Sequence, residues 1–156
     1  MWLPYIRGEK EKMSEDKEIT VHNYLEALRN KKLMGSKCKD CGAQFVPPRK
    51  LCTKCNSTNQ EWVEMSGNGR IAAYSCIGVG TKFFVDKGYS MKKPYCFSVI
   101  ELDEGAMISG QLVGIDEVEL QKTPPKEVVG KPVKATFLET PLEGDEPRVD
   151  LGFELV

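Results

Sequence analysis

Two stretches decide the fold, Cys38-Lys-Asp-Cys41-Gly42 and Cys52-Thr-Lys-Cys55-Asn56, and ten residues lie between Cys41 and Cys52. Four thiolates suit the soft, tetrahedral preference of Zn²⁺. A two-residue gap lets each pair hold one ion while backbone N–H groups face the sulfurs. A positive φ is often needed after the second cysteine of such a pair, where Gly42 and Asn56 stand. The spacing therefore predicts one structural zinc site, closed to water and substrate, with Cys38, Cys41, Cys52 and Cys55 as ligands.

Two other interpretations of the four cysteines remain. Iron in a rubredoxin-like centre uses the same ligand set, so the pattern by itself does not exclude it. Two redox-active CxxC pairs are disfavoured, because no thioredoxin-like βαβ pattern accompanies them. Lys37, Lys39 and Lys54 would offset the net negative charge of a zinc–tetrathiolate centre.

Length and composition restrict the function. The chain has 156 residues, six cysteines and one histidine, His22, so catalysis within this chain alone is disfavoured. No apolar stretch reaches the roughly 18–20 residues that cross a bilayer, and the first residues do not resemble a secretory signal. We expect a cytoplasmic protein without membrane association, in which paired cysteines indicate metal before disulfide.

Positive charge is concentrated around the cysteines. The segment 29–54 has eight cations and one acid, Asp40, a formal +7, so the rest of the chain must have −8 for the total to be −1. Such asymmetry is typical of a surface for phosphates or an acidic partner, although a solvated, lysine-rich module would also show it. The cations are Arg29, Lys31, Lys32, Lys37, Lys39, Arg49, Lys50 and Lys54.

A short amphipathic helix is predicted before the cysteines. Val21, Tyr24, Leu25 and Leu28 follow the spacing of a one-sided apolar stripe, with Asp16 or Thr20 as the N-cap. His22 lies at the edge of this stripe and is expected on the surface or at an interface. The arm at 1–18 is mostly polar, yet it has Trp2, Leu3, Tyr5 and Ile6, which we expect to anchor it on a partner.

Strands and turns follow from residue 62 onward. Short strands are predicted at 62–65, 70–79, 95–102, 106–113, 132–139 and 148–155; 80–94 is expected to be a loop and 114–130 an irregular or partly helical connection. The last five strands, with the longer insertion between the third and fourth, match an OB-fold barrel; an SH3-like barrel or small sandwich has a similar strand count. The predicted fold is therefore mainly β. It consists of an arm (1–18), a helix and linker (19–34), a rubredoxin-like zinc ribbon (35–61) and a five-stranded OB-fold domain (62–156).

Two further cysteines lie inside predicted strands. Cys76 and Cys96 stand among apolar residues, so we expect buried free thiols that behave as small hydrophobes rather than nucleophiles. No catalytic residue is assigned in this chain.

The succession of motifs resembles the family of zinc-ribbon plus OB-fold acyl-CoA-associated proteins, formerly domain of unknown function 35. The resemblance covers about residues 20–155 and rests on several segments in a fixed order. These are Gly35-Ser-Lys-Cys38, Phe45-Val-Pro-Pro-Arg49, Ser66-Gly-Asn-Gly69, Pro94-Tyr95, Leu102-Asp-Glu-Gly105 and Gly110-Gln-Leu-Val113, together with the two cysteine pairs.

This resemblance implies a non-catalytic accessory subunit that assembles with a thiolase-superfamily enzyme and helps to shape its acyl-CoA site. We expect Arg49 and Lys50 to attract the phosphates of CoA, and Phe83 and Phe84 to close over the acyl group, dock on the partner or simply pack at the barrel end. The preferred partner is the catalytic subunit of a degradative thiolase that acts on an aromatic acyl-CoA such as benzoylsuccinyl-CoA.

Three alternatives are kept. An archaeal-type scaffold between thiolase and hydroxymethylglutaryl-CoA synthase would share the same family features. A nucleic-acid-binding protein would use the same two modules, but the acidic barrel half should repel a phosphate backbone. A stand-alone acyl-CoA carrier or hydrolase would act without a partner.

Overall fold

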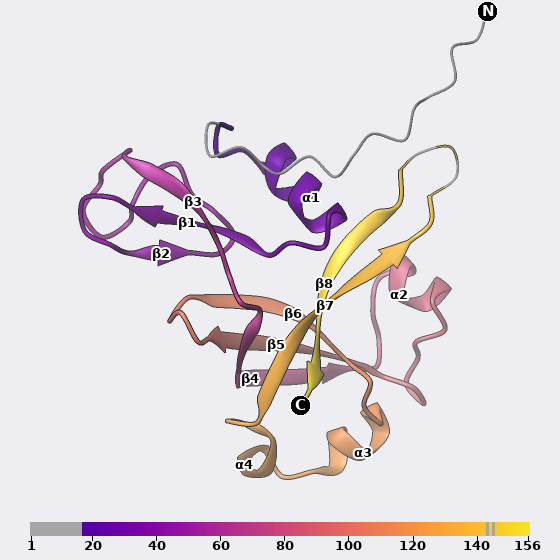
Figure 1. The fold of residues 1–156 in the computed structure, drawn as a ribbon. Helices are drawn as coiled ribbons and strands as arrows, with labels where there is room; N and C mark the ends of the chain where they lie inside the picture. The colour runs from indigo at the N-terminus through magenta and orange to yellow at the C-terminus, as the bar shows by residue number, and fades with distance from the viewer. Residues whose placement is uncertain (1–16, 143, 145) are drawn as a thin grey trace, which may run out of the picture.

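The computed structural model describes residues 17–142, 144 and 146–156 (Figure 1). The apolar residues expected to anchor the arm, Trp2, Leu3, Tyr5 and Ile6, lie outside these ranges, as does the candidate cap Asp16. No helix in the described ranges is both long and apolar enough to cross a membrane. The fold is mainly β, as the sequence predicts, with a small sheet and a closed barrel joined by one connection.

The small sheet lies directly after the first helix. Helix α1 (Val21–Arg29) leads into strand β1 (Met34–Cys38), which pairs with β2 (Gln44–Phe45) on one side and β3 (Gln60–Glu64) on the other, both antiparallel. The order β2-β1-β3 brings the loops that contain the two cysteine pairs to one end of the sheet.

Helix α1 begins where the sequence predicts, and it leaves part of its apolar stripe exposed. The Thr20 hydroxyl accepts a hydrogen bond from the Asn23 backbone N–H at 3.2 Å, which confirms Thr20 as the N-cap. Leu28 is buried, whereas Val21 is 75% and Leu25 42% exposed. The predicted helix is therefore present, and its apolar stripe is only partly covered by the rest of the chain.

The second sheet closes into a barrel of five strands in the order β4-β5-β6-β8-β7, which confirms the predicted OB-fold domain. Closure leaves no free sheet edge, so a small module can still enclose a core. Phe153 and Ile100 are fully buried at its centre. The strands are β4 (Asn68–Ile77), β5 (Tyr95–Leu102), β6 (Met107–Val113), β7 (Pro132–Thr140) and β8 (Arg148–Leu155).

Three short helices occupy the connections of the barrel. Helix α2 (Lys82–Asp86) lies within the segment expected to be a loop, so that expectation is wrong over five residues. Helices α3 (Glu117–Lys122) and α4 (Pro125–Val128) form the insertion between β6 and β7, which agrees with the predicted partly helical connection. Val128 of α4 is fully buried and extends the barrel core.

The two sheets are held in a fixed relation by a shared core. Leu33 and Met65 belong to the same buried cluster as the barrel residues, and the Met65 backbone N–H donates to the Leu33 carbonyl at 2.8 Å. After Met65, the Ser66 backbone N–H donates to the carboxylate of Glu104 at 2.6 Å. Since Met65 is buried and the connection is hydrogen-bonded on both sides of it, the ribbon is not joined to the barrel by a free linker.

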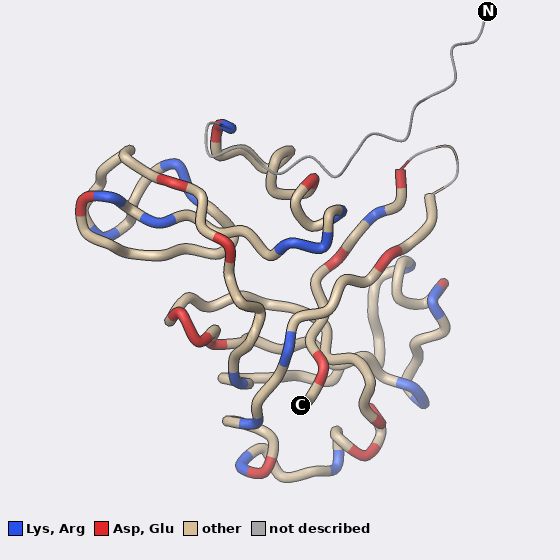
Figure 2. Tube along the Cα trace, viewed as in Figure 1, with Lys and Arg blue, Asp and Glu red and all other residues tan. Residues whose placement is uncertain are grey.

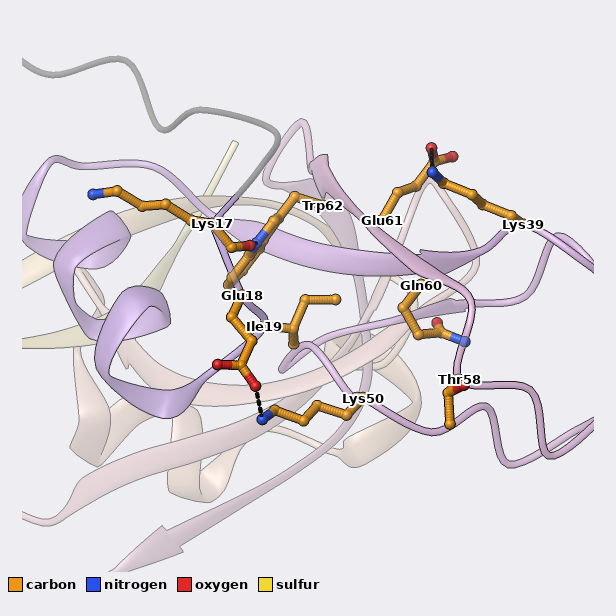
Figure 3. Close-up of a pocket in the computed structure, with 9 residues that line it drawn as sticks. All are labelled: Lys17, Glu18, Ile19, Lys39, Lys50, Thr58, Gln60, Glu61 and Trp62. Atoms are coloured by element: carbon orange, nitrogen blue, oxygen red, sulfur yellow. Dashed lines mark hydrogen bonds and ion pairs between the residues drawn. The ribbon is translucent and has the colours of Figure 1, made fainter.

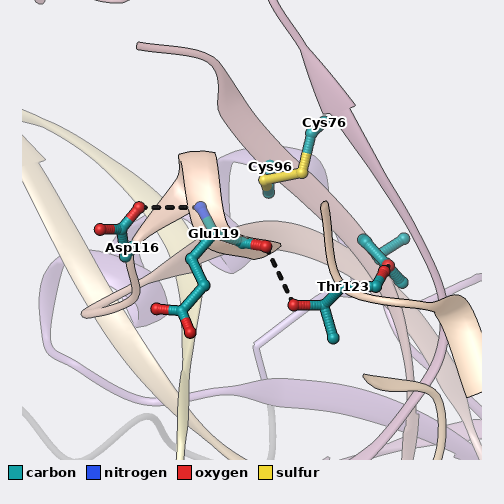
Figure 4. The surroundings of a disulfide bond; sticks show 6 residues. Cys76, Cys96, Asp116, Glu119 and Thr123 are labelled. Carbon is teal, nitrogen blue, oxygen red and sulfur yellow. Dashed lines mark hydrogen bonds between the residues drawn. A yellow bond between two sulfur atoms is a disulfide. The ribbon is translucent and has the colours of Figure 1, made fainter. Parts of the chain in front are cut away.

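Cys76 and Cys96 form a disulfide bond, which corrects the expectation of two free thiols (Figure 4). The residues are directly opposite each other in the β4–β5 ladder, with their Cα atoms 4.0 Å apart. Neighbouring strands bring opposite residues this close only when their register aligns them. Cys96 is fully buried, as expected, but the pairing depends on a register that sequence spacing alone does not give.

The disulfide predicts how many cysteines react with an alkylating agent. In denaturant with a metal chelator but no reductant, we expect four carbamidomethyl groups per chain by intact mass spectrometry, and six after reduction. The Cys76→Ser variant, which frees Cys96, should give five without reductant. Six labels on the unreduced wild-type chain would contradict the bond.

Candidate metal centre

The four cysteines of the ribbon converge on one point. Cys38 ends β1 and Cys41 lies in the turn after it, while Cys52 and Cys55 come from the loop between β2 and β3. All four sulfurs lie within 4.8 Å of one another, with 3.6 Å between Cys38 and Cys55 and 3.5 Å between Cys41 and Cys52. Sulfurs around a tetrahedral ion with Zn–S bonds of about 2.3 Å would lie about 3.8 Å apart. The donor set and its dimensions therefore fit a structural zinc ion.

Each cysteine pair sits on a tight turn of the same kind. The Gly42 backbone N–H donates to the Cys38 carbonyl at 2.8 Å, and that of Asn56 to the Cys52 carbonyl at 2.9 Å. Both residues have positive φ, 75° for Gly42 and 58° for Asn56, as the sequence pattern predicts. Glycine and asparagine tolerate this conformation better than other residues, so the turns close without a large steric penalty.

Backbone N–H groups favour the thiolate form of two ligands. The N–H of Cys41 lowers the pKa of Cys38 to about 6. Against the raising effect of burial, the N–H groups of Cys55 and Lys54 hold the pKa of Cys52 below its usual value. Since the thiolate is the form that binds metal, the ribbon backbone favours metal binding at Cys38 and Cys52.

Asp40 ties the two turns together beside the sulfurs. Its carboxylate accepts hydrogen bonds from the Ser57 hydroxyl and, at 3.1 Å, from the Asn59 side-chain amide. These bonds, that from Ser57 foremost, hold the pKa of Asp40 below its usual range. The single acid of the basic segment is therefore a structural link between the turns.

One of the two predicted CoA contacts of the ribbon, Lys50, lines a cavity of about 600 Å³, whereas Arg49 does not (Figure 3). Lys50 and Lys39 line it together with the indole of Trp62, whose N–H donates to the Lys17 carbonyl at 2.6 Å. Lys50 forms an ion pair with Glu18, and Lys39 with Glu61 at 3.8 Å. The sequence pattern did not indicate Trp62, because the cavity forms only where residues 17–19 fold back over β3.

The basic segment is only partly neutralised within the chain. Arg29 at the end of α1 pairs with Glu146 at 2.9 Å, and Lys31, just after α1, pairs with Glu139 at 3.4 Å, so both ion pairs reach the β7–β8 hairpin. Figure 2 shows the remaining blue positions around the ribbon sheet. In the described part of the chain, Lys32, Lys37, Arg49 and Lys54 form no ion pair, and the Arg49 guanidinium lies 5.6 Å from the centre of the Phe45 ring.

Phe83 and Phe84 lie on α2 and have different surroundings. Phe84 stacks on Tyr95 with ring centres 3.8 Å apart, which fixes α2 against the start of β5. Phe83 contacts Phe84 edge-on and lines a second cavity beside the barrel. Phe84 therefore packs at the barrel end, and both rings line the hollow beside it.

The structure does not bring the four predicted CoA contacts together. Arg49 and Lys50 belong to the ribbon, while Phe83 and Phe84 lie on α2, at the opposite side of the molecule in Figure 1. The cavity that Lys50 lines and the cavity that Phe83 and Phe84 line have no residue in common. His22 lies apart from all of them, exposed on α1 with its Nε2 3.4 Å from the Glu26 carboxylate.

Comparisons with known proteins assign the two parts of this fold. Residues 25–61 match the family described as "ChsH2, rubredoxin-like zinc ribbon domain", and residues 62–138 match "ChsH2, C-terminal OB-fold domain". A "DUF35 domain-containing scaffold protein" of Methanocaldococcus jannaschii is 33% identical over 123 residues, which cover 78% of this chain and 79% of that protein. The chain belongs to the DUF35 family.

Further relatives of the chain have more specific names. "Benzoylsuccinyl-CoA thiolase subunit BbsA" of Thauera aromatica is 34% identical over 95 residues, 56% of this chain and 61% of that protein. Among solved structures, one named "Ltp2-ChsH2(DUF35) aldolase" matches with a TM-score of 0.63 and 26% identity, covering 86% of this chain and 92% of that chain. The resemblance found in the sequence is thus confirmed at the level of the family.

The centre predicts a loss of metal when one buried ligand is changed. We expect wild-type protein to contain about one zinc ion per chain by elemental analysis, and Cys38→Ser to lose most of it, because three thiolates hold zinc less tightly than four. Amide signals of 38–61 should then lose their dispersion in NMR spectra while those of the barrel persist.

Cys76→Ser is the matched control, since it removes a cysteine of the barrel and leaves the ribbon sulfurs intact. It should retain the full zinc content. Wild-type zinc content in Cys38→Ser would contradict the assignment of this residue as a ligand.

Proposed function

We propose that this chain is a non-catalytic accessory subunit of a thiolase-type acyl-CoA enzyme. In this proposal Cys38, Cys41, Cys52 and Cys55 hold one structural zinc ion. The ribbon contacts the CoA portion of the substrate, and the barrel joins the catalytic subunit. The observation that carries the proposal is membership of a family whose other members are named as scaffold proteins and as thiolase subunits.

The placement of the reactive side chains supports a role without catalysis. Four cysteines converge in the ribbon and the other two form a disulfide, so the fold offers no cysteine nucleophile. The one histidine is exposed on α1 and lies beside Glu26 rather than a cysteine or serine. The catalytic groups of a thiolase reaction would then come from the partner.

The ribbon cavity is the place we assign to the CoA nucleotide. Lys39 and Lys50 line one cavity with the Trp62 indole, a combination that suits phosphates beside an aromatic base. Arg49 lies next to Lys50 in the chain and has no ion pair among the described residues. Phe83 and Phe84 would contact the acyl group across the interface with the partner.

Binding of CoA to the isolated chain tests this cavity. We expect the double variant Lys39→Gln/Lys50→Gln to bind CoA about tenfold more weakly in calorimetry, because two charge-assisted contacts are lost and Glu61 and Glu18 lose their partners. Lys122→Gln, an exposed lysine of α3, is the control and should bind like wild type. Equal affinity of the double variant and the control would exclude this assignment.

Assembly with a catalytic subunit tests the function itself. Affinity capture of the tagged full chain from native lysate should retain a thiolase-like protein, identified by mass spectrometry, and the Cys38→Ser variant should retain much less. The assembled enzyme should cleave an aromatic acyl-CoA such as benzoylsuccinyl-CoA, which is our specific proposal for its substrate. Turnover of an acyl-CoA by the isolated chain would overturn the accessory role.

A scaffold between two enzymes is the second candidate, favoured by the name of the archaeal relatives. The mass of the captured complex, measured by light scattering, distinguishes an accessory subunit from a scaffold. A scaffold complex would be larger, because it would hold both a thiolase and a hydroxymethylglutaryl-CoA synthase. Tight, steeply salt-dependent binding of oligonucleotides would instead favour a nucleic-acid-binding protein.

A further inference from the structure

A cavity of about 380 Å³ lies between α2 and the outside of the barrel, within the volume range of small-molecule sites. Residues of α2, β5, β6, β7 and β8 line it, so it exists only in the closed barrel. Its walls are largely apolar and aromatic, and none of them belongs to the ribbon. The apolar lining consists of Phe83, Phe84, Phe97, Leu138 and Leu151.

The floor of this α2 cavity is fixed rather than adaptable. Phe84 is stacked on Tyr95, and Tyr89 packs edge-on against the same two rings. Gln111, which lines the cavity, donates to the Tyr89 hydroxyl at 2.8 Å. These side chains are therefore already ordered before a ligand binds, so binding costs little of their conformational entropy.

Two cations converge on the Phe83 ring at the mouth of the cavity. The Lys87 ammonium lies 4.3 Å and the Arg148 guanidinium 4.7 Å from the ring centre. Lys87 also donates to the Thr140 hydroxyl at 2.8 Å, which fixes its position. Lys87 directly follows α2 and Arg148 begins β8, so the fold gathers positive charge from two separate segments beside an apolar hollow.

One carboxylate balances only part of this charge. Asp150 accepts from Nε of Arg148 at 2.9 Å, which orients the guanidinium. Among the described residues, the two terminal nitrogens of Arg148 have no acceptor, so the fork that recognises carboxylates stays available. Lys87, Arg148 and Asp150 together leave the cavity with a net charge of +1.

We propose that the α2 cavity binds a small carboxylate with an apolar body. The body packs against Phe83, Phe97 and Leu151, and the carboxylate pairs with the terminal nitrogens of Arg148 and with Lys87. Identifying this ligand as an acyl group with a free carboxylate, presented by a CoA thioester, rests on the proposed function. The preference of the cavity for an apolar carboxylate does not.

A matched set of probes tests this preference on the full-length, zinc-loaded chain. We expect 3-phenylpropionate to shift the amide signals of Ser109, Gln111 and Arg148 in NMR titrations, with a dissociation constant of about a millimolar for so small a ligand. The neutral 3-phenylpropionamide should bind about tenfold more weakly, because it lacks the charge-assisted contact. Acetate, which lacks the apolar body, should cause no shift at these residues.

Variants test separately what the charged side chains and the apolar wall contribute to binding. Arg148→Gln should bind the amide as before but lose the preference for the acid over the amide. Lys87→Gln should reduce the same preference. Ser109→Trp should fill the cavity and abolish binding of both probes. Lys92→Gln removes an exposed cation that does not line the cavity and should bind like wild type.

The outcomes are distinguishable from those of the functional proposal. Equal affinity for acid and amide, or shifts that persist in Ser109→Trp, would overturn the cavity assignment even if the chain assembles with a thiolase. Stronger binding of glutaryl-CoA than of pentanoyl-CoA would support an acyl group as the source of the carboxylate. Binding of the free acids alone would support a free acid and exclude the thioester.

Discussion

The ribbon depends on what its four sulfurs hold, because it has almost no core of its own. Around the metal centre the buried cluster consists of Cys38, Ala43 and Cys52, with Phe45 packed against it. Two of these three buried residues are the sulfur donors themselves. Burial of so little apolar surface cannot offset the entropy of ordering the two cysteine turns, and a zinc ion, which the four sulfurs fit, would supply the missing stability.

The barrel has a core of its own and needs no metal ion, and it fixes the orientation of the ribbon. Leu33 and Met65 place the ribbon connection inside the same core as Phe153 of the barrel. The ion pair between Arg29 and Glu146 adds a second contact at α1. The ribbon cavity and the α2 cavity are therefore held at opposite sides of one rigid body, and a partner enzyme would meet both in a fixed geometry.

Much of the fold could be predicted because its signals are local. The alternation of apolar residues and the turn at Asp103-Glu-Gly105 predict β5 and β6 closely, and Gly105 has the positive φ that such a turn needs. The insertion before β7 likewise follows from its prolines and glycines. The short helix α2 was missed because its five residues, with two adjacent phenylalanines, have no helical periodicity, and packing of Phe84 on Tyr95 holds them.

The sequence by itself determined the metal centre, since each pair of sulfur donors lies within one turn and the glycine or asparagine that closes it is adjacent. Only the tertiary structure decided the rest. The disulfide of Cys76 with Cys96 depends on strand register, and the exposure of Leu25 depends on which face of α1 meets the barrel. Lys87 and Arg148 are more than sixty positions apart in the chain. Both lie over the Phe83 ring, because barrel closure places α2 beside β8. Contacts of this kind depend on long-range packing, which spacing along a chain does not encode.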